Sequence, residues 1–199
     1  MLSVAQPVKT IYEVQKSKFF CFLFPVTTMD MVEEHLSEIK KQYPDATHHC
    51  YAYIIDNYKR CSDDGEPSGT AGTPILNVLE KQNLNFILCI VVRYFGGVLL
   101  GAGGLVRAYT NSVTTALKEA SFADMVLGQE IDIVFSYEDK KHVDLLLKDT
   151  AILSSNYQEV ISYQIIAPNI IWNEIKEQLF PYLLDYRVKK TCYCILKKN

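Results

Sequence analysis

The chain has 199 residues, of which 49% are hydrophobic and 22% are charged, and its formal net charge is −3. This composition is typical of globular proteins and excludes a largely disordered chain, while the length favours two domains that each bury a core. The slight negative charge excludes a general positive field that attracts nucleic acids, so any such binding must use a local basic patch.

The first part of the chain predicts a sheet with one helix inserted in it. Alternating apolar and polar residues indicate three strands, at residues 8–14, 17–26 and 47–56. A hairpin turn is expected at Gln15–Lys16, between the first two strands. Between the second and third strands, Thr28 or Asp30 can cap an amphipathic helix that Pro44 stops.

The six cysteines are scattered, and Cys21 and Cys89 lie inside apolar runs, which indicates a reduced, cytoplasmic protein. Adjacent residues of a strand point to opposite faces, so His48 and Cys50 should share one side and His49 should take the other. No second ligand pair has the spacing of a zinc site, and we expect no metal or other cofactor. We also expect neither export nor membrane insertion, because no apolar run is long enough for either.

Eight of the nine glycines lie between residues 65 and 104, where the elements alternate with loops. A glycine-rich loop at 62–72 leads to a helix predicted to start at Thr73–Pro74. Residues 86–95 are apolar on both faces, as is typical of a central strand, and a helix from about 104 to 122 should follow.

The composition changes near 123–128, which is where we place the domain boundary. The following segments predict the order strand, helix, strand, strand, helix, strand, which is the βαββαβ order of a ferredoxin-like domain. The fold class is therefore predicted as α+β, with domains at 1–124 and 125–199.

The glycines before the long helix indicate an anion site. Gly101, Gly103 and Gly104 leave backbone N–H groups without partners at the start of a helix, and such groups favour binding of a phosphate. Arg93, at the exit of the central strand, and Arg107, in the first turn of the helix, can face the same pocket. The alternative is that Arg93 is a structural partner for a nearby acid, because a charge beside a buried strand is seldom unpaired.

The loop DDGEPSGTAG carries three acids, Asp63, Asp64 and Glu66, that are candidates for metal ligands or for structural partners. For Asp63 and Asp64 the structural hypothesis is favoured, because acids commonly cap turns and bond their own backbone. Hydroxyl and N–H donors to a phosphate can come from Ser68, Thr70 and Thr73.

The final strand and the tail are locally basic through Arg187, Lys189, Lys190, Lys197 and Lys198. Such a surface can contact RNA and would assist the glycine-rich loops. The alternative is solubility and protection of a sheet edge, which is the commoner reason for lysines at such positions.

Three segments together resemble the signature of the IMPACT/YigZ family: ATHHCYAY at 46–53, SDDGEPSGTAGTPIL at 62–76 and VVRYFGGVLLGAGGLVRAYTNSV at 91–113. The resemblance covers about residues 1–124. It implies a first domain with the left-handed βαβ fold of ribosomal proteins and domain IV of elongation factor G, which GHMP kinases share. The order predicted for 125–199 is similar to the small ferredoxin-like domain of bacterial members.

Eukaryotic relatives are linked to translation initiation through the amino-acid-starvation kinase pathway, partly by an additional RWD domain, so that specific role is not transferred. The resemblance implies a translation-associated protein, rather than an enzyme, that binds RNA, the ribosome or a protein partner. The alternative is an enzyme related in fold to GHMP kinases that binds a nucleotide or another phosphate-containing ligand, with magnesium held by the three acids. A third hypothesis is that the glycines serve only tight turns and close packing.

Overall fold

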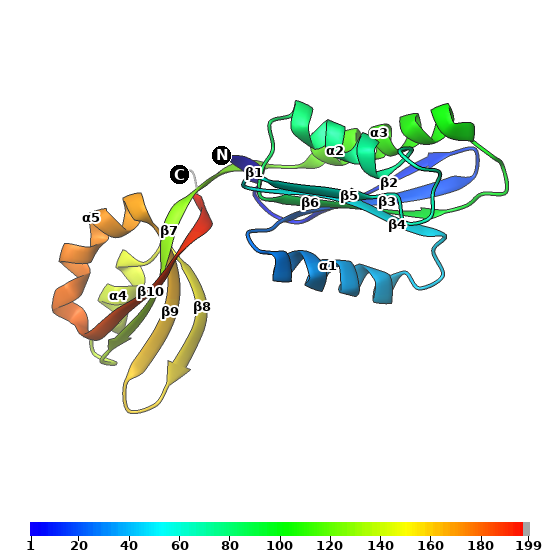
Figure 1. The fold of residues 1–199 in the computed structure, drawn as a ribbon. Coiled ribbons are helices and arrows are strands. Elements are labelled where there is room, and N and C mark those ends of the chain that lie inside the picture. Colours follow the sequence, from blue (N-terminus) through cyan, green and yellow to red (C-terminus); the bar gives the residue numbers. More distant parts are fainter. Residues whose placement is uncertain (197–199) are drawn as a thin grey trace. The chain divides into compact units, whose positions relative to one another are not determined.

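The structure is a computed structural model that describes residues 1–196, so Lys197 and Lys198 lie outside the described residues. The chain divides into two compact units, Met1–Ala123 and the residues from Asp124 onward. Each unit combines an antiparallel sheet with helices, so the predicted α+β class is confirmed (Figure 1). Within residues 1–196, no helix is both long and apolar enough to cross a membrane.

The sheet of the first unit has the strand order β2-β3-β6-β4-β5, and every pair in it is antiparallel. Its strands are β2 (Val8–Val14), β3 (Ser17–Pro25), β4 (His48–Ile55), β5 (Tyr58–Ser62) and β6 (Ile87–Tyr94). Strand β6 is central and almost wholly buried, as its apolar sequence predicts. The predicted hairpin is confirmed, because Gln15 (φ 44°) and Lys16 (φ 63°) form the two-residue turn with the positive φ angles of a type I′ turn.

Helices cover both faces of this sheet. Helix α1 (Met29–Gln42) lies on one face, and α2 (Gly72–Lys81) and α3 (Gly101–Glu119) lie together on the other (Figure 1). Thr28 caps α1, accepting the Met31 N–H at 3.3 Å. The main core of the unit includes Phe19 and Ile75 and fills the space between the sheet and helices α2 and α3.

Several element boundaries differ from the prediction. Helix α3 starts at Gly101 and ends at Glu119, so its glycines lie inside the first turn rather than before it. Helix α2 starts at Gly72 with Ala71 as the N-cap residue, so Thr73 does not cap it. The short strands β1 (Leu2–Val4) and β5 were not predicted, because β1 is only three residues long and the polar sequence of β5 shows no alternation.

The second unit has the predicted order βαββαβ. Its elements are β7 (Phe122–Phe135), α4 (Lys140–Leu146), β8 (Ala151–Tyr157), β9 (Ile161–Pro168), α5 (Asn169–Leu179), the 3₁₀ turn η1 (Phe180–Tyr182) and β10 (Leu183–Leu196). The strand order is β10-β7-β9-β8, and α4 and α5 cover one face (Figure 1). Strand β7 starts at Phe122 and runs through Gly128, which is a point of close packing: a Cβ there would lie 2.5 Å from Cys194 Sγ.

Candidate functional site

The carboxylate of Asp63 organises the glycine-rich loop. Its Oδ2 accepts the N–H of Gly69 at 2.8 Å, and its Oδ1 accepts the N–H groups of Ala71 at 2.9 Å and Gly72 at 2.8 Å. The last two belong to the start of α2, whose N–H groups have no partners within the helix. Asp63 therefore caps α2 from a distance and places a negative charge at the positive end of its dipole. This is why the helix starts before Thr73.

Burial by itself raises the pKa of Asp63, but the three N–H donors outweigh burial and hold the pKa below its ordinary value of 3.8. A carboxyl with a lowered pKa stabilises the fold above its unfolded-state pKa, and this contribution is lost as the pH falls through the folded-state pKa. We expect Asp63→Ala to lower the free energy of unfolding by about 1–2 kcal/mol at pH 7. The difference from the parent chain should shrink below pH 3.8.

Urea denaturation at pH 7 and pH 3 measures both effects. Asp45→Ala, which removes an exposed carboxylate, is the matched control and should change the midpoint little at either pH. An Asp63→Ala loss that stays the same at both pH values would contradict the capping role.

Asp64 ties the same loop to β4. Its Oδ2 accepts the backbone N–H of His49 at 2.7 Å, and its carbonyl oxygen lies 2.9 Å from Nδ1 of His48. Asp64 (φ 43°) and Gly65 (φ 88°) both adopt left-handed backbone conformations, which turn the chain sharply here. The two acids favoured as structural in the sequence are thus both engaged with backbone donors.

Glu66 forms the buried centre of the site. Its side chain is 2% exposed, and its Oε1 accepts hydrogen bonds from Arg93 Nη1 at 2.6 Å and from the Tyr109 hydroxyl at 2.9 Å. The guanidinium of Arg93 also lies 5.5 Å from the ring centroid of Phe19 and 5.6 Å from that of Phe95. Charge pairing, hydrogen bonds and two ring contacts together hold Arg93 inside the fold.

Cys50 and His48 complete the surroundings of Glu66. Cys50 Sγ lies 2.9 Å from the Asp63 carbonyl oxygen and 3.2 Å from the Tyr109 hydroxyl oxygen, while His48 Nε2 lies 3.8 Å from Glu66 Oε2. Burial raises the pKa of Cys50 to about 12 and also raises that of Tyr109. Both groups therefore stay protonated at neutral pH and act as hydrogen-bond donors, and Cys50 is not poised as a nucleophile.

The alternation predicted for 48–50 is present, because His48 and Cys50 face this network while His49 Nε2 lies 3.0 Å from the Tyr43 carbonyl oxygen on the other side. Within the described residues, no group of three His, Cys, Asp or Glu side chains is arranged to hold a metal ion. The three acids of the loop instead serve N–H groups, a guanidinium and a hydroxyl.

We name the side chains of Cys50, Glu66, Arg93 and Tyr109 the buried network. The sequence patterns indicated Glu66 and Arg93 as candidate site residues, but they did not indicate Cys50 or Tyr109 as members of the network. Tyr109 lies four residues from both Leu105 and Val113, which share the buried face of α3. A buried tyrosine hydroxyl needs a hydrogen-bond partner, so this spacing could have indicated that Tyr109 takes part in a buried polar network.

Arg93 and Arg107 do not share an environment. Arg93 is 5% exposed and paired with Glu66, which is the structural alternative considered from the sequence. Arg107 is exposed on α3, and a Cβ added at Gly103 would lie 3.7 Å from its Nη1. Thr70 is buried and donates its hydroxyl to the Pro67 carbonyl oxygen at 2.6 Å. Of the predicted phosphate donors, Arg93 and Thr70 are therefore engaged inside the fold.

The start of α3 presents backbone donors at the surface. Leu100 is the N-cap residue and its side chain makes no capping hydrogen bond, while Gly101 and Gly103 are exposed and Gly104 is half-buried. We name residues 95–107 the α3 entry. Its exposed apolar side chains include Phe95, Val98, Leu99 and Val106, with Leu99 85% exposed.

A groove of about 400 Å³ separates α2 from α3 and brings Thr73 near the second turn of α3. Its polar lining is made of hydroxyl, amide and ammonium groups from Thr73, Asn77, Lys81, Gln82, Thr110 and Thr114. Ser68 is exposed on the adjoining loop. The two helices thus bring together polar groups that lie up to 41 positions apart in the sequence, from Thr73 to Thr114.

The basic residues of β10 lie beside acids of β7. Lys189 Nζ is 3.6 Å from Glu130 Oε1 and 3.7 Å from Asp132 Oδ2, and Lys190 Nζ is 3.2 Å from Glu130 Oε2. These pairs neutralise part of the predicted basic surface. Arg187 remains exposed on the same strand.

Fold and site together define a class of two-unit α+β protein in which a glycine-rich loop and a glycine-rich helix start are built around a buried ionic network. Residues 15–117 match the model of the Impact N-terminal domain. The chain belongs to the IMPACT family.

The similarity to several known proteins extends over most of the chain. IMPACT family member YvyE of Bacillus subtilis is 38% identical over 156 residues, covering 76% of this chain and 72% of that protein. IMPACT family member YigZ of Escherichia coli is 34% identical over 171 residues, covering 82% of this chain and 84% of that protein. A crystal structure described as a hypothetical protein shares 32% identity with a TM-score of 0.64, covering 90% of this chain and 91% of that one. Rat Protein IMPACT is 33% identical over 116 residues, 36% of its length.

Proposed function

We propose that this chain is a translation-associated regulatory protein that binds the ribosome through the α3 entry. The observation that carries the proposal is the glycine-rich first turn of α3, in which Gly101 and Gly103 are exposed and a Cβ at Gly103 would lie 3.7 Å from Nη1 of Arg107. Helix N-termini and arginine side chains are the groups that proteins use to hold backbone phosphates. In this proposal they bind ribosomal RNA.

The apolar side chains of the α3 entry support a macromolecular partner. Leu99 is 85% exposed, and Phe95, Val98 and Val106 are each between 38% and 45% exposed. Exposed apolar residues that cluster in one short segment mark binding sites more often than scattered ones do. A ribosomal surface offers phosphates beside apolar protein and base surfaces, which matches this mixture.

Family membership supports the same role. Relatives named Protein IMPACT are present in rat and human, and the family resemblance implies a link to translation. The engagement of Asp63, Asp64 and Glu66 in the scaffold supports a binding protein over a magnesium-dependent enzyme, because those carboxylates already serve protein donors.

Co-sedimentation with purified ribosomes at low salt tests the proposal. We expect Leu99→Asp/Arg107→Glu to weaken binding about tenfold or more, because it replaces a phosphate contact by repulsion and an apolar contact by a charge. Leu153→Asp/Arg60→Glu changes an exposed leucine and an exposed arginine outside the α3 entry in the same way and should bind normally.

Three results would contradict the proposal. The first is failure of the parent chain to co-sediment with ribosomes at low salt, and the second is equal binding by the two double variants. The third is stabilisation of the protein by a nucleotide with magnesium in a thermal-shift assay, which would support the phosphate-ligand enzyme instead. Binding that survives digestion of the RNA would assign the α3 entry to a protein partner.

A further inference from the structure

The groove between α2 and α3 continues the α3 entry along the surface of the first unit. Val106 belongs to both, because it lies within the α3 entry and also lines the groove. The side chains on the two walls recur at every fourth residue: Thr73, Asn77 and Lys81 on α2, and Val106, Thr110 and Thr114 on α3. Residues four apart share one face of a helix, so two ladders of mostly polar side chains line the groove.

The polar groups of this groove are mainly uncharged. Among the described residues that line it, Lys81 is the one charged residue, and none is aromatic. The other polar groups are hydroxyls and amides, which carry oxygen acceptors as well as donors. Within residues 1–196, the side chains of Thr73, Asn77 and Lys81 are exposed and make no hydrogen bond or ion pair with the protein. They are therefore available to a ligand.

We propose that this groove holds the ribose–phosphate backbone of single-stranded RNA and distinguishes RNA from DNA by its 2′-hydroxyl groups. The inference rests on the proposed function, because the strand enters the groove from the α3 entry. A phosphate oxygen has no proton to donate at neutral pH, whereas a 2′-hydroxyl both donates and accepts, as the groups that line the groove do. The ribose carbons pack on the apolar lining residues Pro74, Val78 and Val106.

The dimensions of the groove favour a single strand that is bound without regard to base sequence. Packed helices have axes about 8–10 Å apart, a gap that one strand fills and a duplex exceeds. From Gly103 to Thr114, α3 rises about 16 Å, which corresponds to about five nucleotides stacked at about 3.4 Å each. Bases are commonly held by stacking on aromatic rings, and the described lining has none. The bases therefore contribute little to binding.

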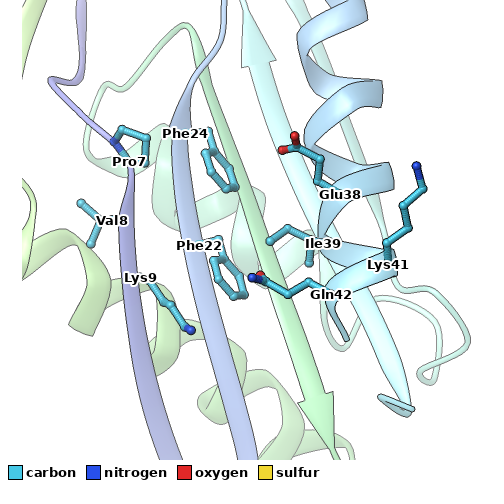
Figure 2. A pocket seen from close by; sticks show the side chains of 9 residues that line it. All are labelled: Pro7, Val8, Lys9, Phe22, Phe24, Glu38, Ile39, Lys41 and Gln42. Atoms are coloured by element: carbon cyan, nitrogen blue, oxygen red, sulfur yellow. The ribbon is translucent and has the colours of Figure 1, made fainter. Parts of the chain in front are cut away.

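The groove of about 680 Å³ between β2 and α1 lacks these features. Its lining includes the rings of Phe22 and Phe24 and the carboxylate of Glu38 (Figure 2). Phe22 is only 4% exposed, so it offers no free face on which a base can stack, and the carboxylate repels phosphate. Lys41 lies in the last turn of α1 as Lys81 lies in the last turn of α2, so it provides a matched control.

Fluorescence anisotropy of labelled hexanucleotides tests the proposal on the full chain. The probes are oligouridine, its 2′-deoxy form and its 2′-O-methyl form, which differ only at the 2′ position. We expect the chain to bind the RNA at least tenfold more tightly than either modified strand, because neither keeps the hydroxyl donor. The 2′-O-methyl strand keeps the shape of the ribose, so it separates loss of the donor from a change in sugar conformation.

The contribution of the groove is tested by Asn77→Leu/Thr110→Val, which removes an amide and a hydroxyl from opposite walls with little change in side-chain size. This variant should bind the RNA at least tenfold more weakly and the 2′-deoxy strand unchanged, so the preference for RNA should be lost. Asn156→Leu/Thr191→Val makes the same changes at exposed positions of the second unit and should bind like the parent chain.

Lys81→Gln tests the phosphate contact separately. It should weaken binding of RNA and DNA alike, and it should reduce the slope of the logarithm of the binding constant against the logarithm of the salt concentration by about 0.7. Lys41→Gln should change neither quantity, because the groove beside α1 binds no RNA in this proposal.

Equal binding of the three hexanucleotides would overturn the proposal, as would equal binding of the RNA by the two double variants. Absence of binding to every hexanucleotide, in a chain that still co-sediments with ribosomes, would overturn it and leave the proposed function intact. A preference for RNA that depends on Asn77 and Thr110, in a chain that does not co-sediment, would support the groove and contradict the ribosomal proposal. The two proposals therefore fail in different experiments.

Discussion

Glu66→Ala is expected to lower the free energy of unfolding of the first unit by about 3–5 kcal/mol, because it leaves the buried guanidinium of Arg93 without its counter-charge. Arg93 is 5% exposed and Nη1 donates to Glu66 Oε1 at 2.6 Å. The same substitution removes the acceptor of the Tyr109 hydroxyl. Hydrogen exchange at β6 amides measures the loss, since the single tryptophan, Trp172, lies in the second unit and does not report on the first.

Glu80→Ala is the matched control for this prediction. It removes the same side chain from the Lys59–Glu80 pair, whose Nζ–Oε1 distance is also 2.6 Å but whose side chains are 49% and 37% exposed. Because solvent screens exposed pairs, its cost should stay below about 1 kcal/mol. The double substitution Glu66→Leu/Arg93→Met should be more stable than Glu66→Ala, because it removes both charges and fills the space. Equal losses for Glu66→Ala and Glu80→Ala would contradict the role of the buried network.

Gly96→Ala should destabilise the first unit by about 3 kcal/mol, the upper end of the cost of forcing atoms into a packed site. A Cβ at Gly96 would lie 2.0 Å from the carbonyl carbon of Lys16 and 2.3 Å from the backbone nitrogen of Ser17. These are backbone atoms of the β2–β3 turn, so they cannot rotate away as the end of a side chain can. Thermal unfolding of the variant followed by far-UV circular dichroism measures the effect.

Gly97→Ala separates this clash from the backbone preference of glycine. Gly97 has φ 83°, and a Cβ there would meet no atom within 4 Å. Its substitution should therefore cost only the strain of a left-handed conformation, about 1 kcal/mol. A Gly96→Ala loss no larger than that of Gly97→Ala would show that the turn moves aside.

The buried network changes how the family signature is interpreted. Its members come from all three segments that carry the family resemblance: Cys50 from the first, Glu66 from the second, and Arg93 and Tyr109 from the third. These segments meet as scaffold, joining β4, β6, α3 and the glycine-rich loop. In the proposed function, the residues that contact the ribosome are those that the scaffold leaves at the surface, above all the exposed Leu99 and Arg107 of the α3 entry.

Local patterns by themselves determined much of the fold. The alternation at 8–14, the apolar run at 86–95 and the hairpin at Gln15–Lys16 predicted β2, β6 and the turn that precedes β3, because side-chain periodicity and turn geometry act over neighbouring residues. The same is true of the βαββαβ order after residue 124. Element boundaries were less accurate, and α2 shows why: its cap is a carboxylate nine residues before Gly72, outside any local capping pattern.

Only the tertiary structure decided which charged groups belong to the scaffold. Three acids within four residues were equally placed in the sequence to meet Arg93, and the left-handed turn at Asp64 and Gly65 selects Glu66 for it. A groove lined by Lys9 of β2 and Glu38 of α1 likewise joins residues 29 positions apart in the sequence (Figure 2). Composition and periodicity set which elements form, but a buried charge is assigned its partner by long-range packing, since desolvation penalises every pairing that the fold does not complete.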